Sequence, residues 1–337
     1  MKLRGAIIGF GEVARNGHWP GYAANDDVEI VAVVDRTPAR RELAESLQPG
    51  ISTYASLADV PRRAPIDFVD ICTPPALHGE PMLDAIGRGW HVLCEKPFLL
   101  DAAALGEARA RATAANVAVI PVHNWKYAPI VQAATAALRS GAIGSLTRVE
   151  IETSRLKAAP TAEHAGVNWR RDPAIAGGGI LMDHGWHSVY IALHWFTEHA
   201  TGVSARLHWP SGEGLVAEDE ARVTIDFPSG SAAIVLTWNG TVRRNAMRLE
   251  GTRGEIVAAD DTLTVRGEAE KTMRFPSALS AGSAHADWFE AMLPDVIAGF
   301  RNPPQSRAVF EEAAQTLAII QQAYATDPAL AGTAAKG

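Results

Sequence analysis

The sequence is poor in cysteine and lacks long apolar runs. Among its 337 residues there are two cysteines, Cys72 and Cys94. Each lies in a short apolar run, which favours buried thiols over a disulfide or a metal-binding pair. No apolar run approaches the length of a membrane span, and the first residues do not resemble a signal peptide. We therefore expect a cytoplasmic protein with no membrane partner.

The chain also lacks an excess of positive charge. Lys and Arg number 31 against 38 Asp and Glu, for a net charge of −7. This balance argues against a nucleic-acid partner, which favours a basic surface. A hydrophobic content of 47% and a charged content of 20% are those of an ordinary globular protein, and the length is sufficient for two domains.

A glycine-rich segment follows the first apolar strand pattern, at residues 3–8. It reads Gly9-Phe10-Gly11-Glu12-Val13-Ala14, the G-x-G-x-x-A form of the dinucleotide fingerprint. The first glycine suits a tight turn, the second allows a pyrophosphate to approach the backbone, and the alanine allows a helix to pack closely on a strand. The helix that begins here offers free N–H groups to phosphates. We expect these six residues to bind a dinucleotide.

An acidic residue, Asp35, ends the second apolar strand pattern, at residues 29–34. In dinucleotide-binding folds an acid at this point accepts hydrogen bonds from the adenosine ribose. Its charge repels a 2′-phosphate and so favours NAD, although Arg36, Arg40 and Arg41 follow closely and leave NADP open.

Strand and helix patterns continue to alternate through the first part of the chain. Strands are expected at residues 66–72, 91–94 and 117–122, and helices at residues 77–88 and 102–115, the latter capped by Asp101. Such alternation predicts a doubly wound parallel sheet. We therefore expect a dinucleotide-binding domain over residues 1–123.

The strand at residues 91–94 runs directly into Glu95-Lys96-Pro97. Ligands of open α/β sheets gather beyond the carboxyl ends of the strands, and a proline fixes the backbone that carries the preceding lysine. Lys96 is thus a candidate catalytic residue. The alternative is that Glu95 and Lys96 only solvate a turn.

A second candidate site follows the glycine triplet at residues 177–179. If a helix runs from there to about residue 196, Asp183 and His187 lie four residues apart on one face. A carboxylate beside an imidazole orients it and favours its protonated form, a general acid/base arrangement. His187 is alternatively a satisfied core histidine. A metal on Asp183, His184 and His187 is a further alternative, but the spacing is not H-E-x-x-H and we expect no metal.

Taken together, these motifs resemble those of the Gfo/Idh/MocA oxidoreductases. The matching features are the glycine loop, Asp35, Thr73-Pro74-Pro75 with His78, Glu95-Lys96-Pro97 and the block at residues 169–187. The resemblance implies an N-terminal Rossmann domain, a C-terminal α/β domain with an open, mainly antiparallel sheet, a catalytic Lys96 and a cis Lys96–Pro97 bond. It implies cofactor contacts from Gly9, Phe10, Gly11, Glu12, Val13, Ala14, Asp35, Arg36, Thr73, Pro74, His78, Glu95 and Lys96.

The second domain is expected over residues 124–325, with a flexible tail from 326 to 337. Its later part has β patterns, including a strand at residues 232–238 that is apolar on both faces and predicts a subunit contact. We expect a homodimer or homotetramer formed through this sheet. Closing helices are expected within residues 283–325, packed in this domain or back on the first.

The resemblance places the substrate against Asn124, Trp169, Arg170, Asp183, His184 and His187. An aromatic ring and a guanidinium suit polyhydroxylated or anionic groups. Lys126 stands where relatives carry an arginine. The expected function is NAD(P)-dependent hydride transfer to or from a secondary alcohol or ketone of a sugar or cyclitol. The alternatives are a redox-neutral glycosidase- or epimerase-like enzyme that holds NAD, and a non-catalytic dinucleotide sensor.

Overall fold

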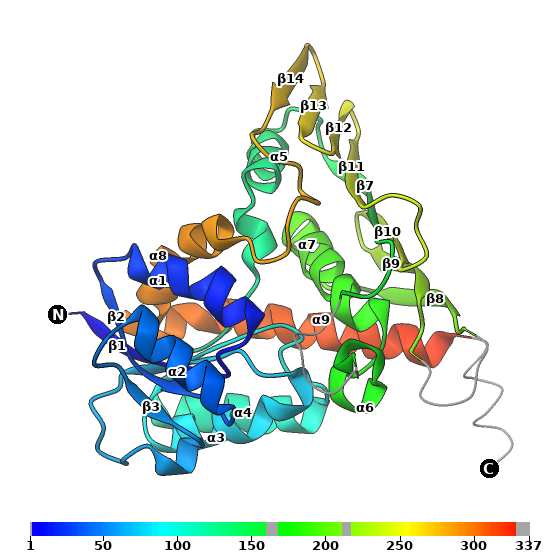
Figure 1. The fold of residues 1–337 in the computed structure, drawn as a ribbon. Helices are drawn as coiled ribbons and strands as arrows, with labels where there is room; N and C mark the ends of the chain where they lie inside the picture. The colour runs from blue at the N-terminus through cyan, green and yellow to red at the C-terminus, as the bar shows by residue number, and fades with distance from the viewer. Residues whose placement is uncertain (1, 160–167, 211–216, 328–337) are drawn as a thin grey trace, which may run out of the picture. The chain divides into compact units, whose positions relative to one another are not determined.

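The computed structural model describes residues 2–159, 168–210 and 217–327. It divides into two compact units, one made of residues 1–124 and 284–314 and the other of residues 125–283 and 315–337 (Figure 1). The expected tail at 328–337 lies outside the described residues, as do residues 160–167 and 211–216.

The first unit contains a six-stranded parallel sheet, in the order β3-β2-β1-β4-β5-β6. This confirms the predicted doubly wound fold. The three-residue strand β3 was not predicted, since so short an edge strand carries little periodicity. The strands are β1 (Leu3–Ile8), β2 (Val28–Val34), β3 (Ser52–Tyr54), β4 (Phe68–Ile71), β5 (His91–Cys94) and β6 (Val119–Pro121).

Helices cover both faces of this sheet: α1 and α8 pack together on one face, and α3 and α4 lie side by side on the other (Figure 1). The Asp101 side chain caps α4 by accepting the Ala104 N–H at 2.7 Å, as predicted. The helical segments are η1 (Ala14–His18), α1 (Trp19–Ala23), α2 (Pro38–Leu47), η2 (Leu57–Asp59), η3 (Pro75–Leu77), α3 (Gly79–Gly87), α4 (Ala102–Ala115), α8 (Ala286–Arg301) and η7 (Pro303–Ser306). Segment η4 (Asn124–Tyr127) spans the boundary after residue 124, and α9 (Arg307–Thr326) that after residue 314.

Helix α8 comes from far along the chain but completes the core of the first unit. Its Phe300 ring packs on Phe68 of β4 and on His91 of β5, with centroid separations of 5.0 and 5.2 Å. Phe289 stacks on His18 at 3.9 Å and meets Tyr22 edge-on. The apolar face left by α1 and the sheet is thus covered by residues that are synthesised late.

The second unit contains an eight-stranded sheet, in the order β14-β13-β12-β11-β7-β10-β9-β8. Of its neighbouring pairs, β7 and β10 run parallel and the others antiparallel, which confirms the open, mainly antiparallel sheet. The strands are β7 (Leu146–Ser154), β8 (Gly202–His208), β9 (Glu220–Phe227), β10 (Gly230–Thr237), β11 (Arg244–Gly251), β12 (Gly254–Ala259), β13 (Thr262–Arg266) and β14 (Glu270–Arg274).

Helices α5 (Pro129–Arg139) and α7 (Trp186–Phe196) cover one face of this sheet. Buried and exposed residues alternate along β9, as predicted for a half-buried strand. The shorter segments are η5 (Trp169–Arg171), α6 (Pro173–Ala176) and η6 (Leu181–Gly185).

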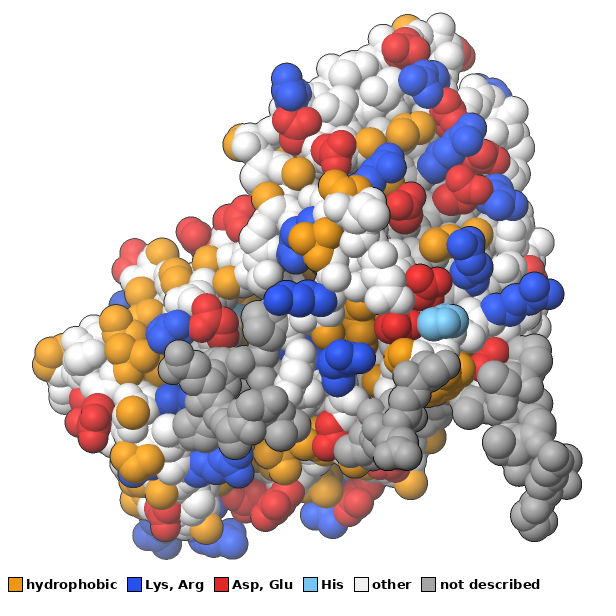
Figure 2. All heavy atoms as spheres, turned by 45° about the vertical axis from the view of Figure 1, so that its right-hand side comes forward, with side chains coloured by type: hydrophobic (Ala, Val, Ile, Leu, Met, Phe, Trp, Pro, Cys, Tyr) orange, Lys and Arg blue, Asp and Glu red, His pale blue; other side chains and the backbone are white. Residues whose placement is uncertain are grey.

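The other face of the sheet is more polar than the sequence predicts. The partly exposed Val235 of β10 is paired with Arg222 on one side and Glu152 on the other. Acidic and basic side chains are also interspersed on the face shown in Figure 2. Among the described helices, none combines the length and apolarity that a bilayer crossing requires.

Candidate active site

The glycine loop lies at the carboxyl end of β1 and has the geometry of a dinucleotide turn. Gly9 has a φ of +87°, and a Cβ there would lie 2.9 Å from Thr73 Cγ2, so glycine is required. A Cβ on Gly11 would meet nothing nearer than the Arg40 guanidinium at 4.0 Å, which leaves the backbone open to a ligand. Ala14 is fully buried. These residues fit a pyrophosphate at the start of the following helix.

Asp35, at the end of β2, is held firmly beside this loop. Its carboxylate accepts the N–H of Phe10 and that of Thr37, each at 2.8 Å, and it is 5% exposed. The Arg40 guanidinium approaches the same carboxylate at 3.3 Å. Arg36, by contrast, is exposed. Arg40 therefore joins Asp35 as a candidate contact for the adenosine ribose, and the sequence pattern alone did not single it out.

The turn after β4 is fixed by His78. The His78 ring is buried, with Nε2 2.7 Å from the Thr73 carbonyl and Nδ1 3.0 Å from the Phe98 carbonyl. It thereby joins the turn that carries Thr73 and Pro74 to the segment after Pro97. A direct contact between His78 and the cofactor stays a prediction.

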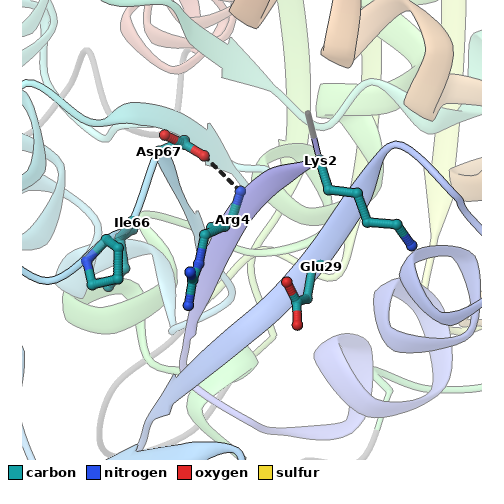
Figure 3. Close-up of a pocket in the computed structure, with 6 residues that line it drawn as sticks. Lys2, Arg4, Glu29, Ile66 and Asp67 are labelled. Carbon is teal, nitrogen blue, oxygen red and sulfur yellow. Dashed lines mark hydrogen bonds between the residues drawn. The ribbon is translucent and has the colours of Figure 1, made fainter.

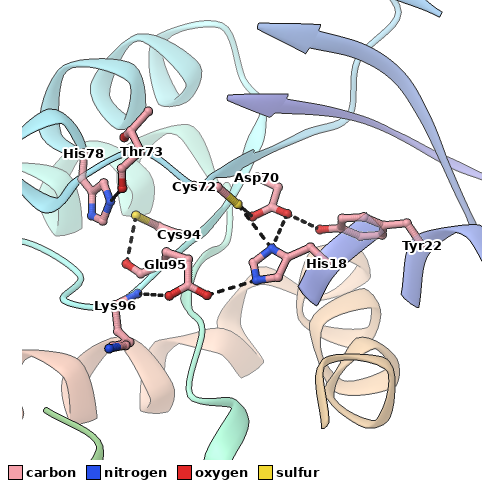
Figure 4. Close-up of polar contacts among 9 residues, drawn as sticks. All are labelled: His18, Tyr22, Asp70, Cys72, Thr73, His78, Cys94, Glu95 and Lys96. Atoms are coloured by element: carbon pink, nitrogen blue, oxygen red, sulfur yellow. Dashed lines mark hydrogen bonds and ion pairs between the residues drawn. The ribbon is translucent and has the colours of Figure 1, made fainter. Parts of the chain in front are cut away.

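Lys96 follows β5 at the same edge of the sheet as the glycine loop. Its N–H donates to the Glu95 carboxylate at 2.9 Å (Figure 4). The Glu95 N–H donates to the Ile71 carbonyl at 2.9 Å. The Lys96–Pro97 bond is cis, as expected. The backbone of Lys96 therefore has a defined position just after the end of β5.

In the second unit, Asp183 lies in η6, a turn of π-helix, where the sequence suggested a continuous α-helix. Such turns often accompany functional sites. The buried Glu218 holds this turn, because its carboxylate accepts the N–H groups of Gly179 and Leu181 at 2.8 and 2.9 Å. Burial raises the pKa of Glu218, while these hydrogen bonds and that from Tyr324 act against the rise. A Cβ on Gly178 or Gly179 would overlap Tyr324 or Glu218, which accounts for the glycines.

Four predicted substrate residues, Asp183 among them, lie together in the second unit. The Asp183 carboxylate lies 3.3 Å from His184 Nδ1 and 3.9 Å from Arg170 Nε. The Arg170 guanidinium lies over the Trp169 ring at 4.4 Å. The second unit therefore presents an indole, a guanidinium, a carboxylate and an imidazole together.

His187 lies in the first turn of α7 and is held on two sides. Its ring stacks on Trp125 at 4.4 Å, and Nδ1 lies 2.9 Å from the Tyr190 hydroxyl. That hydroxyl also accepts the Trp125 N–H at 3.1 Å. The imidazole therefore has one defined orientation, and the sequence did not reveal the contact with Tyr190 that helps to fix it.

Two family models match most of the chain. The model described as an oxidoreductase family with an NAD-binding Rossmann fold matches residues 3–123, and that of the GFO/IDH/MocA C-terminal domain matches residues 131–257. The chain belongs to the Gfo/Idh/MocA family. It is an NAD-binding oxidoreductase, as the resemblance implied.

Individual relatives are similar to this chain over different lengths. An oxidoreductase of Formosa agariphila is 27% identical over 274 residues, which cover 78% of this chain and 81% of the relative. The D-glucoside 3-dehydrogenase of Escherichia coli is 29% identical over 197 residues, 57% of this chain and 53% of the relative. The crystal structure of an NAD binding oxidoreductase from Klebsiella pneumoniae has a TM-score of 0.83 at 19% identity and 97% coverage of each chain, a likeness of fold.

The predicted residues of this family member fall into both units. Residues 9–14, Asp35, Thr73 and Lys96 share the carboxyl edge of the parallel sheet in the first unit, which also contains Asn124. Trp169, Arg170, Asp183, His184 and His187 belong to the second. The catalytic roles of Lys96, Asp183 and His187 stay predictions.

A surface pocket of about 530 Å³ lies at the opposite edge of the parallel sheet, where the strands begin (Figure 3). It is lined by Lys2, Arg4, Glu29, Pro65, Ile66 and Asp67. Since cofactors of this fold bind beyond the carboxyl ends of the strands, this pocket is separate from the candidate site.

Proposed function

We propose that this family member transfers a hydride between a nicotinamide cofactor and a secondary alcohol or ketone of a sugar or cyclitol. The observation that carries the proposal is the position of Lys96. It follows β5 at the edge where the glycine loop follows β1, with only the end of β4 between them in the sheet order. An ammonium donor at the cofactor edge suits chemistry on an oxygen that gains negative charge.

The substrate class is inferred from the second unit and from a relative. Stacked Trp169 and Arg170 beside Asp183 offer an apolar face, donors and an acceptor, which suit a polyhydroxylated ring. The E. coli relative is named for dehydrogenation of a D-glucoside. Both support a sugar or cyclitol over a simple alcohol.

Each catalytic residue has a defined task in oxidation. When bound, the nicotinamide supplies the acceptor for the carbinol hydride. His187 takes the hydroxyl proton on Nε2, which requires that Nδ1 carry the other proton and donate it to the Tyr190 oxygen. Lys96 donates a hydrogen bond to the same substrate oxygen. Asp183 orients the imidazole or holds a neighbouring hydroxyl.

A panel of sugars, cyclitols and their keto forms tests this proposal with NAD and NADP. We expect absorbance at 340 nm to rise with at least one polyol and to stay flat with the Lys96→Met variant. Product without net reduced cofactor would support the redox-neutral alternative. Cofactor binding without any product would support the sensor.

A further inference from the structure

A buried histidine, His18, bridges two carboxylates behind Lys96. Its Nδ1 lies 2.7 Å from Asp70 and its Nε2 lies 3.0 Å from Glu95, while the ring is 1% exposed (Figure 4). The Phe289 ring of α8 stacks on its flat face. His18 ends η1, the segment that begins at the last residue of the glycine loop.

Both ring nitrogens must donate for these contacts to be favourable. A neutral imidazole has a single N–H, whereas the imidazolium has two. Burial lowers the pKa of His18, whereas the Asp70 charge and the contacts with Asp70 and Cys72 raise it. The raising effects together outweigh burial, so the pKa lies well above its usual value. The pKa of Glu95 is lowered by His18 and Lys96 against the effect of burial.

The other titratable groups around the ring are consistent with an imidazolium. Burial and the Asp70 charge raise the pKa of Cys72, which stays a thiol and donates to Asp70. Tyr22 of α1 donates its hydroxyl proton to Asp70 at 3.0 Å, and its pKa is also raised, chiefly by burial. Asp70 therefore accepts from three sides.

His18, Asp70 and Cys72 are also close enough together to suggest a metal site. The 2.7 Å separation of Nδ1 and the Asp70 oxygen is, however, that of a direct hydrogen bond. Two ligands on one zinc ion, each about 2 Å from it, lie farther apart than this. The contacts favour a proton between the two groups.

The bridge ends on the backbone of the candidate catalytic residue. One Glu95 oxygen contacts the His18 ring, and the other accepts the Lys96 N–H. We propose that His18 is a positioning residue, whose ring fixes the Glu95 carboxylate and thereby holds the backbone of Lys96 for catalysis. Its effect on turnover rests on the proposed function; its effect on the backbone does not.

The first test needs no substrate. In protein labelled with ¹⁵N-histidine, we expect the His18 ring signals to be those of an imidazolium from pH 6 to pH 8. A ring with no proton on Nε2 at pH 7 would overturn the proposal. Amide hydrogen exchange at Lys96 should be roughly tenfold or more faster in His18→Asn, whose short amide reaches Asp70 but not Glu95.

Two matched variants separate positioning from general loss of structure. His18→Gln places an amide N–H near the position of Nε2 and should restore slow exchange at Lys96. His91→Gln, at the other end of β5, should leave it unchanged. Equal exchange at Lys96 in wild type, His18→Asn and His18→Gln would overturn the proposal.

Kinetics with a substrate from the panel complete the test. We expect His18→Asn to lower kcat roughly tenfold to a hundredfold, as for a misplaced catalytic group, with the NADH Kd within about twofold of wild type. His18→Gln should recover most of kcat. A loss confined to NADH affinity would contradict the proposal. If no compound on the panel is oxidised but exchange responds as expected, the proposed function fails and the positioning role stands.

If His18→Asn fails to fold, Asp70→Asn is used in its place. The asparagine side chain has the shape of the Asp70 carboxylate but no charge. The His18 ring should then titrate within the measured pH range, and exchange at Lys96 should rise to the extent that Nε2 loses its proton. If the exchange rate at Lys96 stays constant while Nε2 loses its proton, the proposal is overturned.

Discussion

Lys96 and His187 act on one oxygen in the proposed reaction, so their contributions depend on each other. We expect Lys96→Ala and His187→Ala each to lower kcat roughly a hundredfold or more, the range for a lost oxyanion donor or proton-transfer group. The double variant should be little worse than either single variant, because the second change acts on a disabled site. Steady-state kinetics with NADH titrations measure this.

Cofactor binding provides the control for these variants, since the NADH Kd should change far less than kcat. A double variant whose loss is the product of the two single losses would show that the residues act independently. Near-normal turnover by Lys96→Ala would remove the lysine from the reaction.

Asp35 and Arg40 have opposite effects on the choice of cofactor. The carboxylate repels a ribose 2′-phosphate, whereas the guanidinium 3.3 Å away attracts it. Because Asp35 also accepts two backbone N–H groups at the loop, we expect it to prevail and NADH to bind about tenfold more tightly than NADPH. Fluorescence titration of both cofactors decides this, and preference for NADPH would mean that the arginines dominate.

The His18–Glu95 pair should make stability depend on pH. Because the pKa of His18 is higher in the folded protein, protonation of this residue stabilises the fold. Its contribution is complete below the unfolded pKa of about 6.5 and is lost as the pH rises through the folded pKa. The lowered pKa of Glu95 contributes above about 4.5 and is lost in acid. The difference in unfolding free energy between wild type and His18→Gln should therefore be largest between pH 5 and 6.5. Urea denaturation at pH 5.5, 7 and 8.5 measures it; a difference that grows with pH would contradict this assignment.

At the scale of single elements, the turn η6 depends on the glycines before it. A methyl group on Gly179 would overlap the Glu218 backbone, so Gly179→Ala should destabilise the protein by roughly 2 kcal/mol or more. Gly106 in α4 has open space around its Cβ position, and Gly106→Ala should instead stabilise by about 0.5–1 kcal/mol through helix propensity. Chemical denaturation compares the two, and equal effects would refute this account of the turn.

Elements with a strong repeat and clear end signals were predictable from the sequence. Strands β1 and β5 begin and end where the apolar runs do, and α4 starts after its Asp101 cap. The π-turn η6 was not, because an apolar helical pattern does not distinguish α from π winding. The polar outer face around β10 was not predictable from the sequence either, because the charged neighbours of Val235 come from β7 and β9.

The candidate site was predictable where one short motif carries the chemistry, as for the glycine loop and Lys96. Residues that act through long-range packing were not. His18 meets Asp70 and Glu95 only when β1, β4 and β5 lie side by side. Glu218 meets Gly179 only through folding of the second unit. An acid within the buried strand FVDI was the one local signal of this network.

At the scale of the whole molecule, we expect a homodimer or homotetramer through the second sheet. The partly apolar centre of β10 has charged side chains on both sides, which suits a subunit interface with both apolar and polar contacts. Light scattering at micromolar concentration should report a multiple of the chain mass. Val235→Glu should lower it, whereas Leu47→Glu, at an exposed apolar position of α2, should not. A single-chain mass for the wild type would contradict the expectation.

The interrupted first unit has a consequence for how the protein is made. Helix α8 supplies the rings that cover His18, Phe68 and His91, yet it is synthesised after all of residues 125–283. On a ribosome that interval lasts on the order of tens of seconds, during which the nascent cofactor domain keeps an uncovered apolar face. An excised fragment ending near residue 124 would carry the same defect permanently. A workable minimal domain must therefore join residues 2–124 to residues 284–314 through an artificial linker.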